Sequence, residues 1–220
     1  MVQYIDLSHT IFDGLVTYKG LPAPLICDYM SREQSRVNYD EGTTFQIGKI
    51  EMVTNTGTYI DCPFHRFEHG HDLSEVAINH FADLEAITID ARGVMAVGPE
   101  FFIDQEIGDK AVLVYTDWAR NWNTTEYYEC HPYVTAEAAA YLKDHKAILV
   151  GIDSHNIDDT RIRTRPVHTT LLGAGILIVE HLCNLGELPA SGYWFNAVPP
   201  KIKGAGTFPV RAYAKLGVDF

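Results

Sequence analysis

The sequence predicts an α/β protein built on a mixed β-sheet with few helices. Short apolar runs rich in β-branched residues recur along the chain and favour buried strands. One segment, 136–146, has the composition of a helix and leads directly into an apolar run, which is typical of a helix-to-strand crossover. The chain has 220 residues without an internal repeat or a long linker, so we expect one domain over 1–220.

Strands are expected wherever such an apolar run occurs. They are predicted at 45–54, 84–90, 111–116, 147–153, 175–182 and 207–216. The run Ile87-Thr88-Ile89 is β-branched throughout, and 111–116 has the uniformly apolar pattern of a buried strand. The last segment alternates between apolar and polar residues, which suits a strand that closes the sheet.

Two helices are expected. The segment 136–146 contains strong helix formers, basic residues in its last turn and Thr135 in position to cap its first turn. A second helix is predicted at 73–81, after the polar loop His69-Gly70-His71-Asp72. The segment 117–133 between elements carries two Trp and three Tyr. It is suited to lining a pocket or an oligomer interface, and equally to a surface loop packed by its own aromatic residues.

The charge of the chain excludes several classes of partner. The formal net charge of −12 disfavours nucleic acid and anionic membrane surfaces. No apolar run approaches the roughly 20 residues that span a bilayer, and 1–6 lacks the features of a signal peptide.

Four scattered cysteines without a CxxC pair indicate reduced thiols, so we expect a cytoplasmic protein. The segment 161–165 carries three arginines, which form a solvated loop by default or contact an anionic substrate or a partner chain.

The densest chemical signal lies at 55–65, with the sequence NTGTYIDCPFH. Asp61 and His65 stand on a predicted loop after a strand, where a carboxylate and an imidazole can bind a metal or transfer protons. The same spacing also occurs in ordinary loops, where the histidine only bonds the backbone. On spacing alone, both interpretations stay open.

This segment resembles the HxGTHxDxPxH signature of the cyclase family, which includes bacterial arylformamidases and isatin hydrolase. The matching positions are Gly57, Thr58, Asp61, Pro63 and His65. Four further landmarks follow the family pattern in order. They are Asp6-Leu7-Ser8-His9, Thr116-Asp117-Trp118, Gly151-Ile152-Asp153-Ser154, and the stretch from His168 through Glu180.

The resemblance implies a mixed, partly barrel-like sheet with flanking helices, of the swivelling β/β/α type. It also implies a divalent metal, zinc in preference to manganese, held by Asp61, His168 and Glu180, with His65 as the acid–base residue. Tyr18 stands near the position of an aromatic residue that contacts the substrate. The family further implies a homodimer or homotetramer in which an N-terminal arm reaches a neighbour.

Two positions depart from the signature. Asn55 and Tyr59 replace the two histidines of the first metal site, and neither is a good neutral ligand for zinc. We rank three interpretations. One metal remains on Asp61, His168 and Glu180, so that one ion is preferred to two; or His69 or His71 folds back as a substitute ligand; or the site is empty.

The functional hypothesis is a metal-dependent hydrolase of a small amide, formamide, lactone or cyclic amide. The metal activates water as the nucleophile, His65 transfers the proton, and Tyr59 is placed to donate a hydrogen bond to the oxyanion. N-formylkynurenine, and with it the kynurenine pathway, is permitted by the resemblance. The alternative is a non-catalytic relative that binds a small ligand.

The remaining aromatic and imidazole side chains complete the expectations. The pocket should be partly aromatic, with contributions from Tyr18 and 118–133. His9 is expected to be structural or near the pocket, and His155 to lie at the surface. The other histidines are treated as ordinary; they are His80, His131, His145 and His181.

Overall fold

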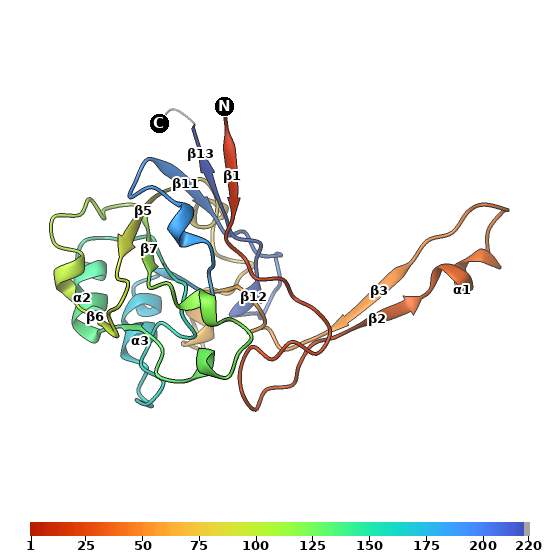
Figure 1. The fold of residues 1–220 in the computed structure, drawn as a ribbon, viewed down its shortest axis with the longest axis horizontal. Coiled ribbons are helices and arrows are strands. Elements are labelled where there is room, and N and C mark those ends of the chain that lie inside the picture. Colours follow the sequence, from red (N-terminus) through yellow and green to blue (C-terminus); the bar gives the residue numbers. More distant parts are fainter. Residues whose placement is uncertain (218–220) are drawn as a thin grey trace.

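The computed structural model describes residues 1–217, and its centre is a nine-stranded mixed sheet (Figure 1). The strand order across the sheet is β1-β13-β11-β5-β7-β9-β10-β4-β12. The strands are β1 (Gln3–Asp6), β4 (Tyr59–Asp61), β5 (Leu84–Asp90), β7 (Ala111–Tyr115), β9 (Leu149–Ile152), β10 (Leu177–Glu180), β11 (Tyr193–Asn196), β12 (Thr207–Pro209) and β13 (Tyr213–Leu216).

The middle of the sheet is parallel and both of its flanks are antiparallel. Strands β5, β7, β9 and β10 run parallel to one another, and every other pairing in the sheet is antiparallel. All four parallel strands coincide with predicted apolar runs. The mixed, curled sheet with few helices confirms the expected fold class.

Two hydrophobic cores cover the two faces of the sheet. On one face, side chains such as Val112, Val150 and Ile178 pack with the helices α2 (Ala136–Asp144) and α3 (Pro166–Gly173). On the inner face of the curl, Leu113, Leu149 and Val179 from the same strands pack with residues of the antiparallel flanks. Because adjacent residues of one strand belong to different cores, the strands are apolar throughout rather than alternating.

The predicted helix at 136–146 is present as α2, and the Thr135 side chain accepts a hydrogen bond from Ala138 N as expected of an N-cap. The helix predicted at 73–81 is wrong. Only a 3-10 turn at Ile78–His80 forms there, because Ala77 adopts an extended conformation and interrupts any longer helix. None of the helices within residues 1–217 is long and apolar enough to cross a membrane.

The strand predicted at 207–216 is in fact two strands on different flanks of the sheet. Strand β12 pairs with β4, whereas β13 lies between β1 and β11. Pro209 ends β12, and it has no N–H with which to continue the ladder. The chain then crosses from one flank of the sheet to the other.

A long arm leaves the body of the protein before β4 (Figure 1). It consists of β2 (Leu25–Met30), the short helix α1 (Arg32–Arg36) and β3 (Ile47–Glu51), with β2 and β3 paired as an antiparallel ribbon. The strand predicted at 45–54 is this β3, and all of its residues are exposed.

The remaining elements are short. They are the parallel pair β6 (Ala96–Val97) and β8 (Tyr133–Val134), and 3-10 turns at Pro63–His65, Pro99–Phe101, Trp118–Asn121, Glu126–Tyr128 and Leu185–Glu187.

Candidate functional site

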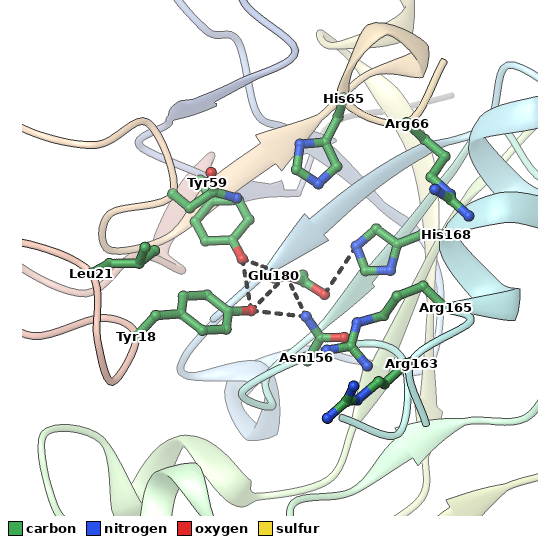
Figure 2. A pocket seen from close by; sticks show the side chains of 11 residues that line it. Tyr18, Leu21, Tyr59, His65, Arg66, Asn156, Arg163, Arg165, His168 and Glu180 are labelled. Carbon is green, nitrogen blue, oxygen red and sulfur yellow. Dashed lines mark hydrogen bonds and ion pairs between the residues drawn. The ribbon is translucent and has the colours of Figure 1, made fainter. Parts of the chain in front are cut away.

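A pocket of about 360 Å³ opens beside the carboxyl ends of β9 and β10, where open α/β sheets commonly bind ligands (Figure 2). The side chains that line it come from five separate parts of the chain. They are Tyr18, Leu21, Asn55, Tyr59, His65, Arg66, Asn156, Arg163, Arg165, His168 and Glu180. Five of the six candidate site residues therefore meet at this pocket: Tyr18, Tyr59, His65, His168 and Glu180.

Asp61 is completely buried and does not line the pocket itself, but it adjoins the lining residues His65 and His168. It ends β4, between β10 and β12, and its cross-strand partner on β12 is Thr207. The Thr207 hydroxyl donates a short hydrogen bond to Asp61 Oδ1. Asp61 Oδ2 is buried without any hydrogen-bond partner. An unpartnered, buried carboxylate oxygen is costly unless a cation or another polar group satisfies it.

His168 lies on α3 and turns its Nε2 atom toward Asp61. The distance from Nε2 to Asp61 Oδ2 is 3.7 Å, and that to Glu180 Oε1 is 3.6 Å. Its Nδ1 atom is 2.6 Å from Asp158 Oδ2. Asp158 also accepts hydrogen bonds from the backbone N–H groups of Val167 at 2.8 Å and His168 at 3.0 Å, so it fixes both the ring and the first turn of α3.

The carboxylates around His168 outweigh the effect of its burial. Burial lowers the pKa of His168, but the hydrogen bond to Asp158 and the charges of Glu180 and Asp61 raise it to about 10. A divalent cation at Nε2 would compete with that proton. A carboxylate on the far nitrogen of a histidine is also a usual arrangement around metal ligands, because it fixes the tautomer and the ring orientation.

These donors fit a metal ion. Among residues 1–217, Asp61, His65 and His168 form the group whose ligand atoms all lie within 4.8 Å of one another. Two imidazoles and a carboxylate are ligands that zinc accepts, and Asp61 Oδ2 has no other partner. Glu180, expected as the third ligand, is not a member of that group, although its Oε1 atom is near His168 Nε2.

Glu180 is instead held by a dense set of hydrogen bonds. The Tyr59 hydroxyl donates to Oε2 at 2.5 Å, and the backbone N–H of Ile157 donates to Oε1 at 2.7 Å. Tyr18 and Asn156 approach Oε2 at 3.4 Å. Complete burial raises the pKa of Glu180, against the opposing effects of His168 and of the Tyr59 hydrogen bond.

Tyr59 and Tyr18 are neutral phenols in this arrangement. Burial and the nearby charge of Glu180 raise the pKa of both hydroxyl groups well above the usual value. The Tyr59 hydroxyl also lies 3.0 Å from that of Tyr18, and Asn156 Nδ2 donates to the Tyr18 oxygen at 2.8 Å. Tyr59 therefore acts as a hydrogen-bond donor to Glu180, which differs from the phenolate needed for metal ligation.

His65 occupies the 3-10 turn after β4 and is the most accessible member of the group, with 34% of its side chain exposed. Its Nδ1 atom is 2.8 Å from Thr207 Oγ1. Because the Thr207 proton goes to Asp61, the hydroxyl oxygen must accept from His65 Nδ1–H, and this pattern assigns the free lone pair to Nε2. Gly206 makes this approach possible, because a Cβ there would lie 2.4 Å from His65 N.

The other expected residues lie elsewhere. His69 and His71 are exposed and belong to no metal-capable group within residues 1–217. Asn55 lines the pocket. The aromatic segment 118–133 contributes no side chain to the pocket wall. It packs behind the wall, where Trp122 stacks on His9 with ring centroids 4.0 Å apart.

Two histidines were wrongly placed by the sequence analysis. His155, expected at the surface, is buried, and His181, treated as ordinary, is completely buried. His181 Nδ1 lies 2.8 Å from the Tyr127 hydroxyl, and the His155 ring packs 4.5 Å from that of Tyr18. Both imidazoles therefore support the back of the pocket.

Several landmark residues hold the loops of the site together. Gly57 has a positive φ of 67°, and a Cβ at this position would meet Ile11 at 2.7 Å. The Thr58 hydroxyl donates to the His181 carbonyl and accepts from His9 N. Asp153 accepts three hydrogen bonds, two from Thr116 and one from the backbone N–H of Asp117.

Sequence reasoning missed Asn156, Asp158 and Thr207. Asp158 stands eight residues before Pro166, the first residue of α3, which is too far for a local capping signal, so no sequence pattern marks it. Thr207 carries no local signal, since only its pairing with β4 brings it to Asp61.

Comparison with known proteins agrees with this architecture. The family model described as "Putative cyclase" matches residues 5–159. A kynurenine formamidase of Geobacillus thermodenitrificans (strain NG80-2) is 29% identical over 214 residues, which cover 96% of this chain and 97% of that protein. Another, from Bacillus thuringiensis subsp. konkukian (strain 97-27), is 25% identical over 218 residues, covering 97% of each chain.

Solved structures of cyclase-family hydrolases have the same fold as this chain. A potential metal-dependent hydrolase with cyclase activity superposes with a TM-score of 0.81 at 25% identity, covering 100% of both chains. Isatin hydrolase A from Labrenzia aggregata has the same fold, with a TM-score of 0.81 at 24% identity, covering 98% of this chain and 94% of that one.

Proposed function

The chain belongs to the cyclase family, and from this premise we propose that it is a metal-dependent hydrolase of a small amide or ester-like carbonyl compound. The observation that supports the proposal most directly is the buried, unpartnered Asp61 Oδ2 atom, 3.7 Å from His168 Nε2 and close to His65. The named activity of the formamidase relatives makes an aryl formamide the first substrate class to test, with N-formylkynurenine among its members. Lactones and cyclic amides follow.

We assign the metal to Asp61 and His168, with Glu180 Oε1 as the expected third ligand and zinc as the expected ion before manganese. One ion per chain is expected, because the neutral Tyr59 hydroxyl donates its hydrogen bond to Glu180 and Asn55 is a weak ligand for zinc. When bound, such an ion polarises the substrate carbonyl and lowers the pKa of water toward ~7. Asp158 keeps His168 Nε2 directed toward Asp61.

His65 is assigned the proton transfers. With Nδ1 bonded to Thr207, its Nε2 atom carries the free lone pair and can take a proton from the attacking water. The same atom then returns the proton to the departing nitrogen or oxygen, so that the imidazole is neutral again at the end of the cycle. Its partial exposure at the pocket wall gives it access to a bound substrate.

Tyr59 is assigned to positioning Glu180. The sequence suggested that its hydroxyl stabilises the oxyanion, but its single proton is directed at Glu180 Oε2. A role toward the oxyanion would require exchange of that hydrogen bond during the reaction.

The decisive test is metal content together with formamide hydrolysis. Protein purified without chelator is analysed for metals and assayed with formanilide, beside the variant Asp61→Ala. About one zinc or manganese per chain, lost together with hydrolysis in the variant, is expected. Absence of both metal and turnover after addition of zinc or manganese would contradict the proposal and favour a non-catalytic relative that binds a small ligand.

His65→Ala separates proton transfer from metal binding. If His65 transfers the proton, kcat falls by about 10²–10⁴ while the metal stays bound. Loss of the metal in this variant would make His65 the third ligand in place of Glu180, as the 4.8 Å grouping permits.

The arm leads us to propose a homodimer, or a tetramer built from such dimers. A two-stranded ribbon is marginally stable alone, and this one exposes large apolar side chains. They include Leu25, Tyr29, Val37, Tyr39, Ile47 and Ile50. Light scattering of the full chain tests the proposal, and a monomer at micromolar concentration would contradict it.

A further inference from the structure

The pocket carries an excess of positive charge that the proposed chemistry does not use. Three arginines line it, Arg66, Arg163 and Arg165, and among residues 1–217 none of them pairs with a carboxylate. Every other arginine outside the arm does so. These are Arg92, Arg120, Arg161 and Arg211, each bonded to an aspartate. In a chain with a net charge of −12, unpaired arginines gathered in one pocket indicate a specific role.

Two of these guanidinium groups are held in place, and Arg66 Nε donates to Thr169 Oγ1 at 3.1 Å. Arg165 Nη1 donates to the backbone carbonyls of Asp159 at 3.1 Å and Ile162 at 2.6 Å. Its residue is only partly exposed, and its Nε and Nη2 donors are left for a ligand. Such anchoring lowers the entropy lost when a ligand binds. It also argues against a merely solvated loop.

The arginines have a defined relation to the reacting groups. Arg66 follows His65 directly, and Arg165 precedes His168 by three residues, just before α3. Figure 2 shows Arg66, Arg163 and Arg165 on the same side as His168, with Leu21 on the opposite side. The pocket thus has one cationic wall, which also carries His168, and one apolar wall, with His65 between them.

We propose that the natural substrate carries a carboxylate, which Arg163 and Arg165 bind while Leu21 and Tyr18 contact its apolar part. The planar guanidinium matches a carboxylate with two parallel hydrogen bonds. This inference rests on the proposed hydrolytic function for its kinetic test. Binding of the carboxylate would orient the scissile carbonyl toward His65. The enzyme would therefore hydrolyse amides that carry a carboxylate in preference to uncharged amides.

The kinetic test compares formanilide with 2-, 3- and 4-formamidobenzoate, which add a carboxylate to the same amide. The measured quantity is the ratio of kcat/KM for each formamidobenzoate to that for formanilide. For at least one isomer, Arg163→Ala and Arg165→Lys should each lower this ratio by about tenfold or more. The alanine removes a charge-assisted contact, and the lysine keeps the charge but cannot form two parallel hydrogen bonds with a carboxylate. Comparing ratios cancels any general damage to the enzyme.

Arg161→Ala is the matched control. It removes the same charge from the same loop, but Arg161 is bonded to Asp159 and does not line the pocket. Its ratio should equal that of the wild type. Equal ratios in all three variants, or the same loss in Arg161→Ala, would overturn the proposal.

Direct binding separates this inference from the proposed function. The affinities of 3-aminobenzoate and aniline are measured by calorimetry with the wild type and the same variants. If no formamide is hydrolysed, the proposed function fails, while tighter binding of 3-aminobenzoate that is lost in Arg163→Ala still supports the anion site. Equal affinity for both probes, or tighter binding of inorganic phosphate than of 3-aminobenzoate, refutes the carboxylate assignment.

Discussion

Replacing Asp158 by Asn tests how the site is held together. Both oxygens of Asp158 accept hydrogen bonds, Oδ1 from Val167 N and Oδ2 from His168 N and Nδ1. An asparagine has a single acceptor oxygen, so its NH₂ group must face at least one of these N–H donors. The substitution keeps the side-chain volume, but it removes the negative charge and at least one of the three hydrogen bonds that Asp158 accepts.

The magnitude follows from the contacts. Asp158 is buried, and a lost hydrogen bond to a charged acceptor costs about 1.5–3 kcal/mol. We therefore expect the metal-free variant to be about 2 kcal/mol less stable than the wild type. With an m-value of ~2 kcal/mol/M in urea, the unfolding midpoint shifts by about 1 M. Because Asp158 orients His168, metal affinity should fall by about 10–100-fold.

The assay is urea unfolding of chelator-treated protein, followed by zinc titration of the folded variants. Asp159→Asn serves as the control, since Asp159 pairs with the largely exposed Arg161 and should change stability by less than about 1 kcal/mol. If Asp158→Asn unfolds at the wild-type midpoint and keeps its zinc affinity, then Asp158 neither caps α3 nor orients His168.

Three other changes probe neighbouring features. Thr207→Val removes the hydroxyl that links Asp61 and His65, so kcat for formanilide should fall about 10–100-fold. Thr207→Ser should largely restore kcat. Unchanged kcat in the valine variant would disprove a role for this hydroxyl in the reaction. Gly206→Ala places a Cβ against the His65 backbone and should cost about 1–3 kcal/mol in thermal or urea unfolding, whereas Gly108→Ala, with no atom nearer than 3.7 Å, should be tolerated; equal effects would contradict this. Burial lowers the pKa of His155 to about 3 and that of His181 well below its usual value, so the unfolded chain takes up more protons below pH ~6.5 and stability falls with acidity. The two should together cost about 3 kcal/mol between pH 7.5 and 5.5, and His168, whose pKa is raised, offsets about 1.4 kcal/mol of this because its stabilisation grows until the pH falls below ~6.5. A net loss of about 1–2 kcal/mol is expected, and a higher urea midpoint at pH 5.5 than at pH 7.5 would refute the argument.

The parallel centre of the sheet could be predicted because its signal is local. Strands buried on both faces are predominantly apolar; β7 and β9 show this pattern throughout, β10 up to Glu180, and β5 in its central residues. The 73–81 helix and the single strand at 207–216 failed because Ala77 and Pro209 break regular structure, and the tertiary neighbours that decide these breaks lie far away in sequence.

The site was predictable only where its residues stand close together in a recognisable order. Asp61 and His65 share one turn, and His168 and Glu180 share one helix-to-strand unit. Asp158 and Thr207 act through contacts set by the fold, and the burial of His181 follows from the packing of Tyr127 against it. The sequence left open whether Arg163 and Arg165 face solvent or a ligand, because an arginine-rich segment has the same composition in both cases.

The crossing of the chain between the two flanks of the sheet has a consequence for biosynthesis. β12 pairs with the outer edge of β4, and β13 pairs with β1, so β1 and β4 gain these neighbours only when segment 207–216 has been synthesised. Until residue 207 has left the ribosome, Asp61 and His65 lack the hydroxyl that joins them. The candidate site is therefore complete only after residues 207–216 have been synthesised, and a chain stopped shortly before residue 207 would keep most of its core while lacking a completed site.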